Sequence, residues 1–213
     1  MIISMSDILC VTNRKLCRAD FLTRIEQIAA AHPAGIILRE KDLPEADYAF
    51  LAGKILASCR TQDTPCILHS FHRTAIRLGC RKIHLPLPVL RTLSDEEKAF
   101  FTDIGSSCHS IEDARLAVQL GCTYITAGHI FDTDCKKGLP GRGILFLKDL
   151  CDSVSIPVYA IGGITADNIS FARNAGAAGA CIMSGLMTCE DSAGFIRSCE
   201  EACRPPAHEK SYN

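Results

Sequence analysis

The chain has 213 residues, of which 47% are hydrophobic and 22% are charged, and its 23 basic and 24 acidic side chains leave a net charge of -1. This length and composition fit one globular domain, which we expect to span residues 1–203. The balanced charge offers no broad basic field, so neither nucleic acid nor an anionic membrane is expected as a partner. No apolar run approaches the ~18 residues of a membrane-spanning helix.

The 13 cysteines favour a reducing compartment. Their number is odd, no Cys-x-x-Cys pair occurs, and Cys10, Cys66 and Cys181 lie in apolar runs, where cysteine is typically a small buried residue. The chain does not open with the pattern of a secretory signal, so we predict a cytoplasmic protein with free thiols. Residues 204–213 carry a Pro-Pro pair among polar residues and are predicted to form a disordered tail.

Eight short β-rich runs alternate with segments of helical spacing. The predicted strands are Asp7–Val11, Gly35–Leu38, Cys66–Leu68, Lys82–Leu85, Phe101–Ser106, Tyr124–Ala127, Val158–Ile161 and Ala180–Met183. Between the first two, Phe21, Ile25, Ile28 and Ala29 recur at the spacing of one helix face. Eight such alternations predict an α/β fold, a single-domain (β/α)8 or TIM barrel. An open, doubly wound sheet is the alternative.

The loop that follows the sixth predicted strand is the densest in chemical groups. Residues 128–143 contain His129, Lys136, Lys137, an arginine, the thiol of Cys135 and four glycines. Such a loop predicts a site that holds an anionic small molecule beside a group that moves protons. Imidazole titrates near neutrality, which makes His129 the candidate acid or base.

Each of these residues also has a plain structural interpretation. A lone histidine such as His129 is more often a satisfied structural group than a catalyst. Lys136 and Lys137 could simply be solvated, and residues 39–42 after the second strand could be a solvated charged turn. No histidine or asparagine pattern around Cys135 supports thiolate chemistry.

Glycine turns follow the last two predicted strands. Gly162 and Gly163 come after the seventh strand, and Ser184 and Gly185 come after the eighth. In barrels of this type these two loops commonly bind phosphate, because backbone N–H groups can approach the anion closely. The alternative is two tight turns that bind no ligand.

Several segments together resemble the thiamine phosphate synthase/TenI superfamily. The matching segments, in the order found in that superfamily, are Leu38-Arg39-Glu40-Lys41, Ser107-Cys108-His109-Ser110, residues 128–143, Ile161-Gly162-Gly163-Ile164 and Met183-Ser184-Gly185. They cover most of the chain. The resemblance implies a (β/α)8 barrel, in agreement with the strand count.

The resemblance favours one of the two branches of that superfamily. Its synthases hold Mg2+ with acidic residues after the third and fourth strands, where this chain has Ser70 and Val89. Its tautomerases, the TenI branch, carry a histidine where this chain has His129 and the synthases have proline. The resemblance therefore implies an isomerase of thiamine biosynthesis, a thiazole tautomerase that acts on a carboxythiazole phosphate tautomer without a cofactor or a metal.

The resemblance also implies roles for individual residues. His129 would be the catalytic acid and base. The expected substrate-binding residues are Gly162, Gly163, Ser184 and Gly185 for the phosphate, Thr133, Cys135 and Lys136 for the thiazole, Ser107 as a polar contact, and Arg39 and Lys41 without a defined role. The expected partner is the small-molecule thiazole phosphate, and an apolar end of the barrel could support a homodimer.

Three other functions remain open from the sequence. The first is a thiamine phosphate synthase, a transferase that couples a pyrimidine pyrophosphate to a thiazole phosphate. The second is a non-catalytic regulator that binds a thiazole phosphate. The third is an unrelated phosphosugar isomerase on the same barrel, because a fold alone does not give a function.

Overall fold

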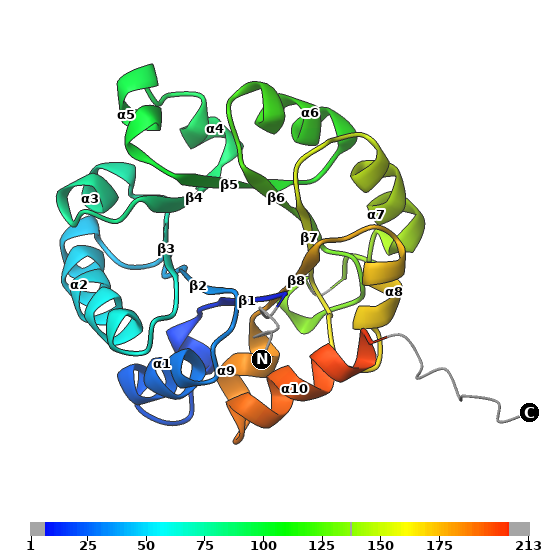
Figure 1. Ribbon diagram of the computed structural model, residues 1–213, viewed down its shortest axis with the longest axis horizontal. Coiled ribbons are helices and arrows are strands. Elements are labelled where there is room, and N and C mark those ends of the chain that lie inside the picture. Colours follow the sequence, from blue (N-terminus) through cyan, green and yellow to red (C-terminus); the bar gives the residue numbers. More distant parts are fainter. Residues whose placement is uncertain (1–6, 137, 205–213) are drawn as a thin grey trace, which may run out of the picture.

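Eight parallel strands form a closed barrel in this computed structural model, which describes residues 7–136 and 138–204 (Figure 1). The strands, in chain order around the barrel, are β1 (Ile8–Val11), β2 (Gly35–Leu38), β3 (Cys66–His69), β4 (Lys82–Pro86), β5 (Asp103–Cys108), β6 (Tyr124–Gly128), β7 (Val158–Ile161) and β8 (Gly179–Ile182). The barrel closes because β1 pairs with both β2 and β8, with Cys10 opposite Ile36 on one side and Ile182 on the other. The predicted (β/α)8 barrel is confirmed, and the open sheet is excluded.

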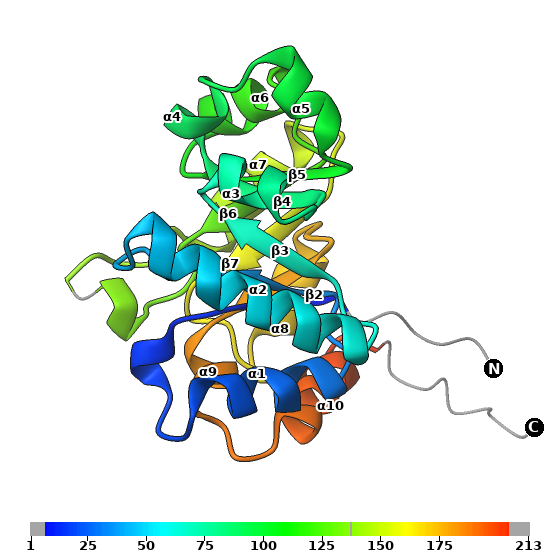
Figure 2. The same cartoon turned by 90° about the vertical axis from the view of Figure 1, so that its left-hand side faces the viewer.

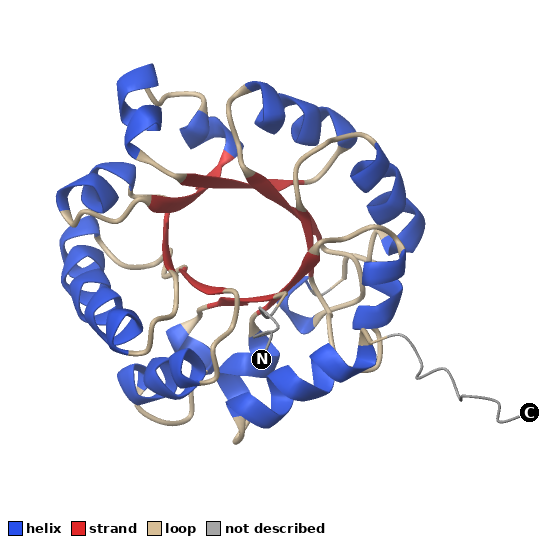
Figure 3. Cartoon of the chain, viewed as in Figure 1, coloured by secondary structure: helices blue, strands red, loops and turns tan. Residues whose placement is uncertain are grey.

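Helices surround the barrel and cover the outer face of its strands (Figure 1, Figure 3). They are η1 (Arg14–Leu16), α1 (Phe21–Ala30), α2 (Glu45–Thr61), α3 (His72–Arg77), α4 (Leu87–Leu90), α5 (Asp95–Phe100), α6 (Ile111–Gln119), η2 (Asp134–Lys136), α7 (Gly143–Asp152), α8 (Ile169–Asn174), α9 (Ser184–Thr188) and α10 (Ser192–Ala202). In α1, the spacing of Ile25, Ile28 and Ala29 buries one face. The helix begins where the Asp20 side chain accepts a hydrogen bond from the Thr23 N–H at 2.9 Å.

Alternate residues of the strands supply two separate cores. Ile8 and Cys10 belong to the large cluster that the helices cover. The smaller cluster consists of Leu9, Val11, Ile37, Ile67, Tyr124 and Cys181. This division follows from the two-residue period of a strand, which sends neighbouring side chains to opposite faces. Val11 and Cys181 also line the cavity described below, so the smaller cluster supports the floor of that cavity.

Four strands, β3 to β6, end one or two residues later than predicted. His69 pairs with His84 between β3 and β4, and Pro86 pairs with Ser107 between β4 and β5. The predicted fifth strand, Phe101–Ser106, is therefore shifted in the structure to Asp103–Cys108. The apolar pattern ends too early in the sequence because β3 and β5 continue into polar residues: His69 bonds Ser70, and Ser107 bonds the ring of His84.

All thirteen cysteines lie among the described residues, and all are free, as predicted. Within the described part of the chain, no helix combines the length and the apolar character needed to cross a bilayer. The predicted tail begins at Arg204, and the rest of it lies outside the described residues. The domain boundary and the homodimer stay predictions.

Candidate active site at the carboxyl end of the barrel

A cavity of about 960 Å³ opens where the strands end and the following loops begin. The predicted site residues that line it are Arg39, Lys41, Ser107, His129, Thr133, Cys135, Lys136, Gly162, Gly163 and Ser184. They come from the ends of five different strands or from the loops after them, and the barrel closure brings these loops to one end. Figure 2 shows the light-green segment around η2 projecting from one end of the barrel.

Gly185 is the predicted site residue that the structure does not bring to the cavity. A side chain at this position would come within 2.6 Å of Cζ of Phe195 and 3.2 Å of Ile182. Gly185 therefore allows α9 to pack closely against α10. The glycine after β8 has a structural reason that the sequence pattern could not separate from phosphate binding.

Four basic side chains line the cavity, and three of them, which come from two loops, are predicted site residues; the fourth is Arg91. We call Arg39, Lys41 and Lys136 the cation cluster; the first two follow β2, and the third lies in η2. None of the three side chains has a hydrogen bond or ion pair with any residue that the structure describes. Partial withdrawal of its amine from solvent lowers the pKa of Lys41, and the charges of Arg39 and Lys136 lower it further. Lys137, which the sequence paired with Lys136, lies outside the described residues.

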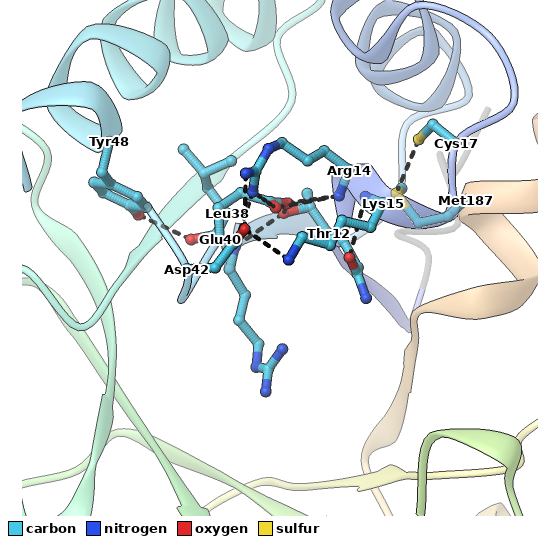
Figure 4. A network of polar contacts seen from close by, with 11 residues as sticks. Thr12, Arg14, Lys15, Cys17, Leu38, Glu40, Asp42, Tyr48 and Met187 are labelled. Carbon is cyan, nitrogen blue, oxygen red and sulfur yellow. Dashed lines mark hydrogen bonds and ion pairs between the residues drawn. The ribbon is translucent and has the colours of Figure 1, made fainter. Parts of the chain in front are cut away.

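Glu40 sits between two of these cations in the sequence but takes no part in the cluster. Its side chain is buried and accepts hydrogen bonds from the Thr12 hydroxyl at 2.7 Å and from the Arg14 N–H at 3.0 Å (Figure 4). Arg14 also bonds Glu40 through its guanidinium at 3.1 Å and Asp42 at 2.6 Å. We call Thr12, Arg14, Glu40 and Asp42 the Glu40 clamp. The clamp shows that residues 39–42 are not merely a solvated turn.

The loops after β6 and β7 interlock beside the cation cluster. The Ile130 N–H donates to the Ile161 carbonyl at 2.9 Å, and the Phe131 N–H donates to the Gly162 carbonyl at 3.0 Å. Gly162 has a φ of +99°, and a Cβ added there would lie 2.8 Å from Cα of His129. Only glycine meets both conditions, so the turn after β7 lies directly against His129.

A side chain fixes the next part of the same turn. The Asn168 amide donates to the Gly163 carbonyl at 2.8 Å and its oxygen accepts from the Thr165 N–H at 2.9 Å. The turn Gly162–Gly163 is therefore held open toward the cavity by its own contacts. This arrangement is suited to an anion that approaches the backbone.

Two histidines border the cavity, and in each of them one ring nitrogen is hydrogen-bonded to a backbone carbonyl. His129 donates from Nε2 to the Leu139 carbonyl at 3.2 Å, and His109 donates from Nδ1 to the Gly128 carbonyl at 3.0 Å. Since a carbonyl oxygen only accepts, the tied nitrogen carries the proton, and the other nitrogen of a neutral ring is an acceptor. His109 was quoted in a matching segment but was not predicted as a site residue.

The floor of the cavity is a network of uncharged polar groups. His84 bonds Ser107 through Nε2 at 2.9 Å and Tyr124 through Nδ1 at 3.1 Å, and His69 stacks on His84. Burial, the neighbouring imidazole and nearby cations lower the pKa of His69 to about 2. Burial and the nearby cations lower the pKa of His84 to about 3. Both rings are therefore neutral at physiological pH.

Sequence reasoning missed several residues of this cavity. His69 and Thr126 line its floor, and Asn13 and Arg91 line its wall. The position of His69 at the end of a strand was a usable signal, and so was the inward alternation of Thr126. Asn13 and Arg91 gave no such signal, because only the closed barrel brings them to the cavity.

Known proteins share both this sequence and this barrel. A family model described as thiamine monophosphate synthase matches residues 8–186. The thiamine-phosphate synthase of Syntrophomonas wolfei is 31% identical over 196 residues, which are 88% of this chain and 91% of that protein. The thiamine-phosphate synthase of Fusobacterium nucleatum is 30% identical over 185 residues, which are 85% of this chain and 89% of that protein.

Solved structures agree on the fold. The thiamine phosphate pyrophosphorylase of Pyrococcus furiosus superposes with a TM-score of 0.79 at 22% identity, covering 93% of this chain and 96% of that chain. A 3-hexulose-6-phosphate synthase superposes with a TM-score of 0.69 at 16% identity, covering 93% and 100% of the two chains. At these identities the likeness shows the barrel and nothing more.

The relatives contradict the predicted activity. The predicted thiazole tautomerase, and with it the isomerase class, is wrong. The alternative, a thiamine phosphate synthase, agrees with the curated relatives, which are named thiamine-phosphate synthase. The tautomerase prediction depended on His129. In the structure this histidine closes its own loop through Leu139 and packs on Gly162, so its presence does not require a proton relay.

Proposed function

Because the chain belongs to the thiamine monophosphate synthase family, we propose that it is a transferase that couples a pyrimidine pyrophosphate to a thiazole phosphate. One observation carries the proposal: a single cavity contains two places suited to anions. The cation cluster of Arg39, Lys41 and Lys136 forms one, and the turn at Gly162 and Gly163 forms the other. Two phosphorylated reactants therefore have separate anchors in one enclosed space.

The reaction needs a leaving group and a nucleophile on opposite sides of the reacting carbon. The bond between the pyrimidine-bearing carbon and the pyrophosphate breaks, and its electron pair leaves with the pyrophosphate. The thiazole ring nitrogen supplies the electron pair of the new bond to that carbon. In this proposal the cation cluster stabilises the charge that gathers on the pyrophosphate. The glycine turn holds the thiazole phosphate by its backbone N–H groups, and the neutral floor of His69 and Ser107 lies beneath both reactants.

The residues of this cavity do not fit the Mg2+ that the superfamily's synthases use. Ser70 and Val89 stand where the resemblance calls for acidic ligands. Among the described residues, no group of three histidine, cysteine, aspartate or glutamate side chains could hold a metal ion. Mg2+ prefers hard, anionic oxygen ligands, which these positions lack. No step of the proposed reaction is therefore assigned to a metal.

A coupling assay tests the proposed function. The full chain is incubated with the pyrimidine pyrophosphate and the thiazole phosphate, and thiamine phosphate and released pyrophosphate are measured together. We expect both products in equal amounts. Lys136→Met should lower kcat/KM by about 100-fold, since it removes a charge that stabilises the leaving group.

Lys54→Met provides the matched control. Lys54 lies on α2, outside the cavity, with its amine over the Phe50 ring at 4.4 Å. Its loss should leave the coupling rate unchanged. If the wild-type protein binds both reactants but forms no thiamine phosphate, the proposed function is wrong.

A further inference from the structure

We infer that the cation cluster of Arg39, Lys41 and Lys136 binds a pyrophosphate group directly, without a divalent cation. The identity of the ligand rests on the proposed function. The manner of its binding rests on the side chains that line the cavity, and it can be tested separately.

The acidic groups near the cavity are few, and neither of them lies after β3 or β4. Among the described residues that line it, the carboxylates are Asp113 and Asp134. Asp113 accepts a hydrogen bond from the His109 N–H at 2.9 Å. From β3, β4 and the loops after them, the lining residues are His69, Arg91 and residues 86–88, which carry no carboxylate. A divalent cation bridging protein and pyrophosphate would lack the anionic oxygens that it needs on the protein side.

Glu40 does not supply the missing anionic oxygens. Its carboxylate lies next to Arg39 in the chain, yet its oxygens accept from Thr12 at 2.7 Å and from the Arg14 N–H at 3.0 Å and 3.2 Å. The side chain is 1% exposed. Glu40 is therefore unavailable as a metal ligand, and it is also kept from pairing with the cations that flank it.

The Glu40 clamp instead positions the cation cluster. The Arg39 N–H donates to the Thr12 hydroxyl at 2.9 Å, and that hydroxyl donates to Glu40. The backbone that carries Arg39 and Lys41 is thereby tied to the loop after β1. A backbone held in this way presents both cations before the ligand arrives, which reduces the entropy lost on binding.

The positive charges of the cation cluster repel one another. The three side chains of the cluster converge on one cavity, and none of them has a hydrogen bond or ion pair with a described carboxylate. The lowered pKa of Lys41 has burial as its first cause and repulsion from Arg39 and Lys136 as the next. A pyrophosphate relieves this repulsion, and the planar guanidinium of Arg39 can bind two of its oxygens at once.

Isothermal titration of the full chain with inorganic pyrophosphate tests the inference. We expect Kd to agree within about threefold between a buffer with EDTA and one with excess Mg2+. Arg39→Gln and Lys41→Met should each weaken binding by about 10-fold or more in both buffers, as expected for the loss of a charge-assisted hydrogen bond. Lys54→Met is the matched control and should bind as the wild type does.

Glu40→Gln tests the positioning role. It keeps the shape of the side chain but weakens its bonds to Arg14, so pyrophosphate binding should weaken while remaining indifferent to Mg2+. Circular dichroism shows whether this variant folds; if it does not, the Arg39 and Lys41 variants still decide the main point. The inference is overturned if no binding occurs in EDTA, if Mg2+ tightens it by about 10-fold or more, or if the cation variants bind normally.

The two proposals fail in different ways. Metal-independent binding of pyrophosphate without coupling would remove the proposed function and leave the inference standing. Coupling accompanied by pyrophosphate binding that requires Mg2+ would support the proposed function and overturn the inference.

Discussion

At the scale of single residues, the contact between Gly162 and His129 explains the most about the cavity. The two residues are distant in the sequence, and each gave a separate signal: a glycine turn for phosphate and a histidine for proton transfer. In the structure they meet, because the bare Cα of Gly162 leaves the space that His129 occupies. The sequence could suggest each residue, but it could not show that the glycine makes room for the histidine.

We expect Gly162→Ala to damage both stability and phosphate binding. The added Cβ collides with His129, and the residue must keep a φ of +99°, which disfavours any side chain. The variant should lose about 1–3 kcal/mol of stability, measured by urea unfolding, and should bind thiazole phosphate more weakly by titration.

Gly53→Ala is the matched control for that substitution. Gly53 lies inside α2, and a Cβ there meets nothing within 4 Å. Because alanine favours a helix more than glycine does, this change should stabilise the protein by about 0.5–1 kcal/mol and leave binding unaltered. Equal stability of the two variants would show that the Gly162 turn is not constrained as described.

At the scale of elements, four neighbouring strands build the polar floor. The side chains of His69, His84, Ser107 and Tyr124 come from β3, β4, β5 and β6 and meet inside the barrel. The sequence placed these strands correctly, because apolar runs mark them. It ended all four of them too early. In β3 and β5 the first missed residue is polar, and a polar residue in a strand looks like a loop residue until its buried partner is known.

The neutral floor predicts acid sensitivity. Burial lowers the pKa of His69 to about 2, whereas an unfolded histidine titrates near 6.5. Below about pH 6.5 His69 binds a proton in the unfolded chain but not in the folded chain. The stability of the fold therefore falls as the pH falls from there toward 2. At pH 5 this one group should cost about 2 kcal/mol relative to pH 8. His69→Gln should remove that part of the loss in urea unfolding at the two pH values.

The matched control for that prediction is an exposed histidine. His32 lies between α1 and β2, outside the cavity, and His32→Asn keeps a residue that tolerates its φ of 49°. This variant should lose stability between pH 8 and pH 5 as the wild type does. An unchanged pH dependence in His69→Gln would mean that the floor does not hold His69 neutral.

At the scale of the whole molecule, the sequence predicted the fold better than the activity. Eight alternations of strand and helix favoured a barrel over an open sheet, and the closed pairing of β1 with β8 decided between them. The activity depended on a few residues, above all His129, whose side chain can close a loop or move a proton. The relatives named thiamine-phosphate synthase contradict the predicted tautomerase activity, whereas the role of His129 stays a prediction.

The distribution of charge over the molecule gives a last prediction. The net charge is only -1, yet one end of the barrel gathers Arg39, Lys41 and Lys136 with no described ion-pair partner. The attraction for pyrophosphate is therefore local, and part of it acts through solvent around the exposed Lys41 and Lys136. Salt shortens the reach of exposed charges from about 10 Å at 0.1 M to about 3 Å at 1 M. Over that range the Kd for inorganic pyrophosphate should rise several-fold, and Lys136→Met should show a shallower rise. The assignment of Lys136 to the anion site would be contradicted if Kd did not change with salt, or if it rose equally for the wild type and for Lys136→Met.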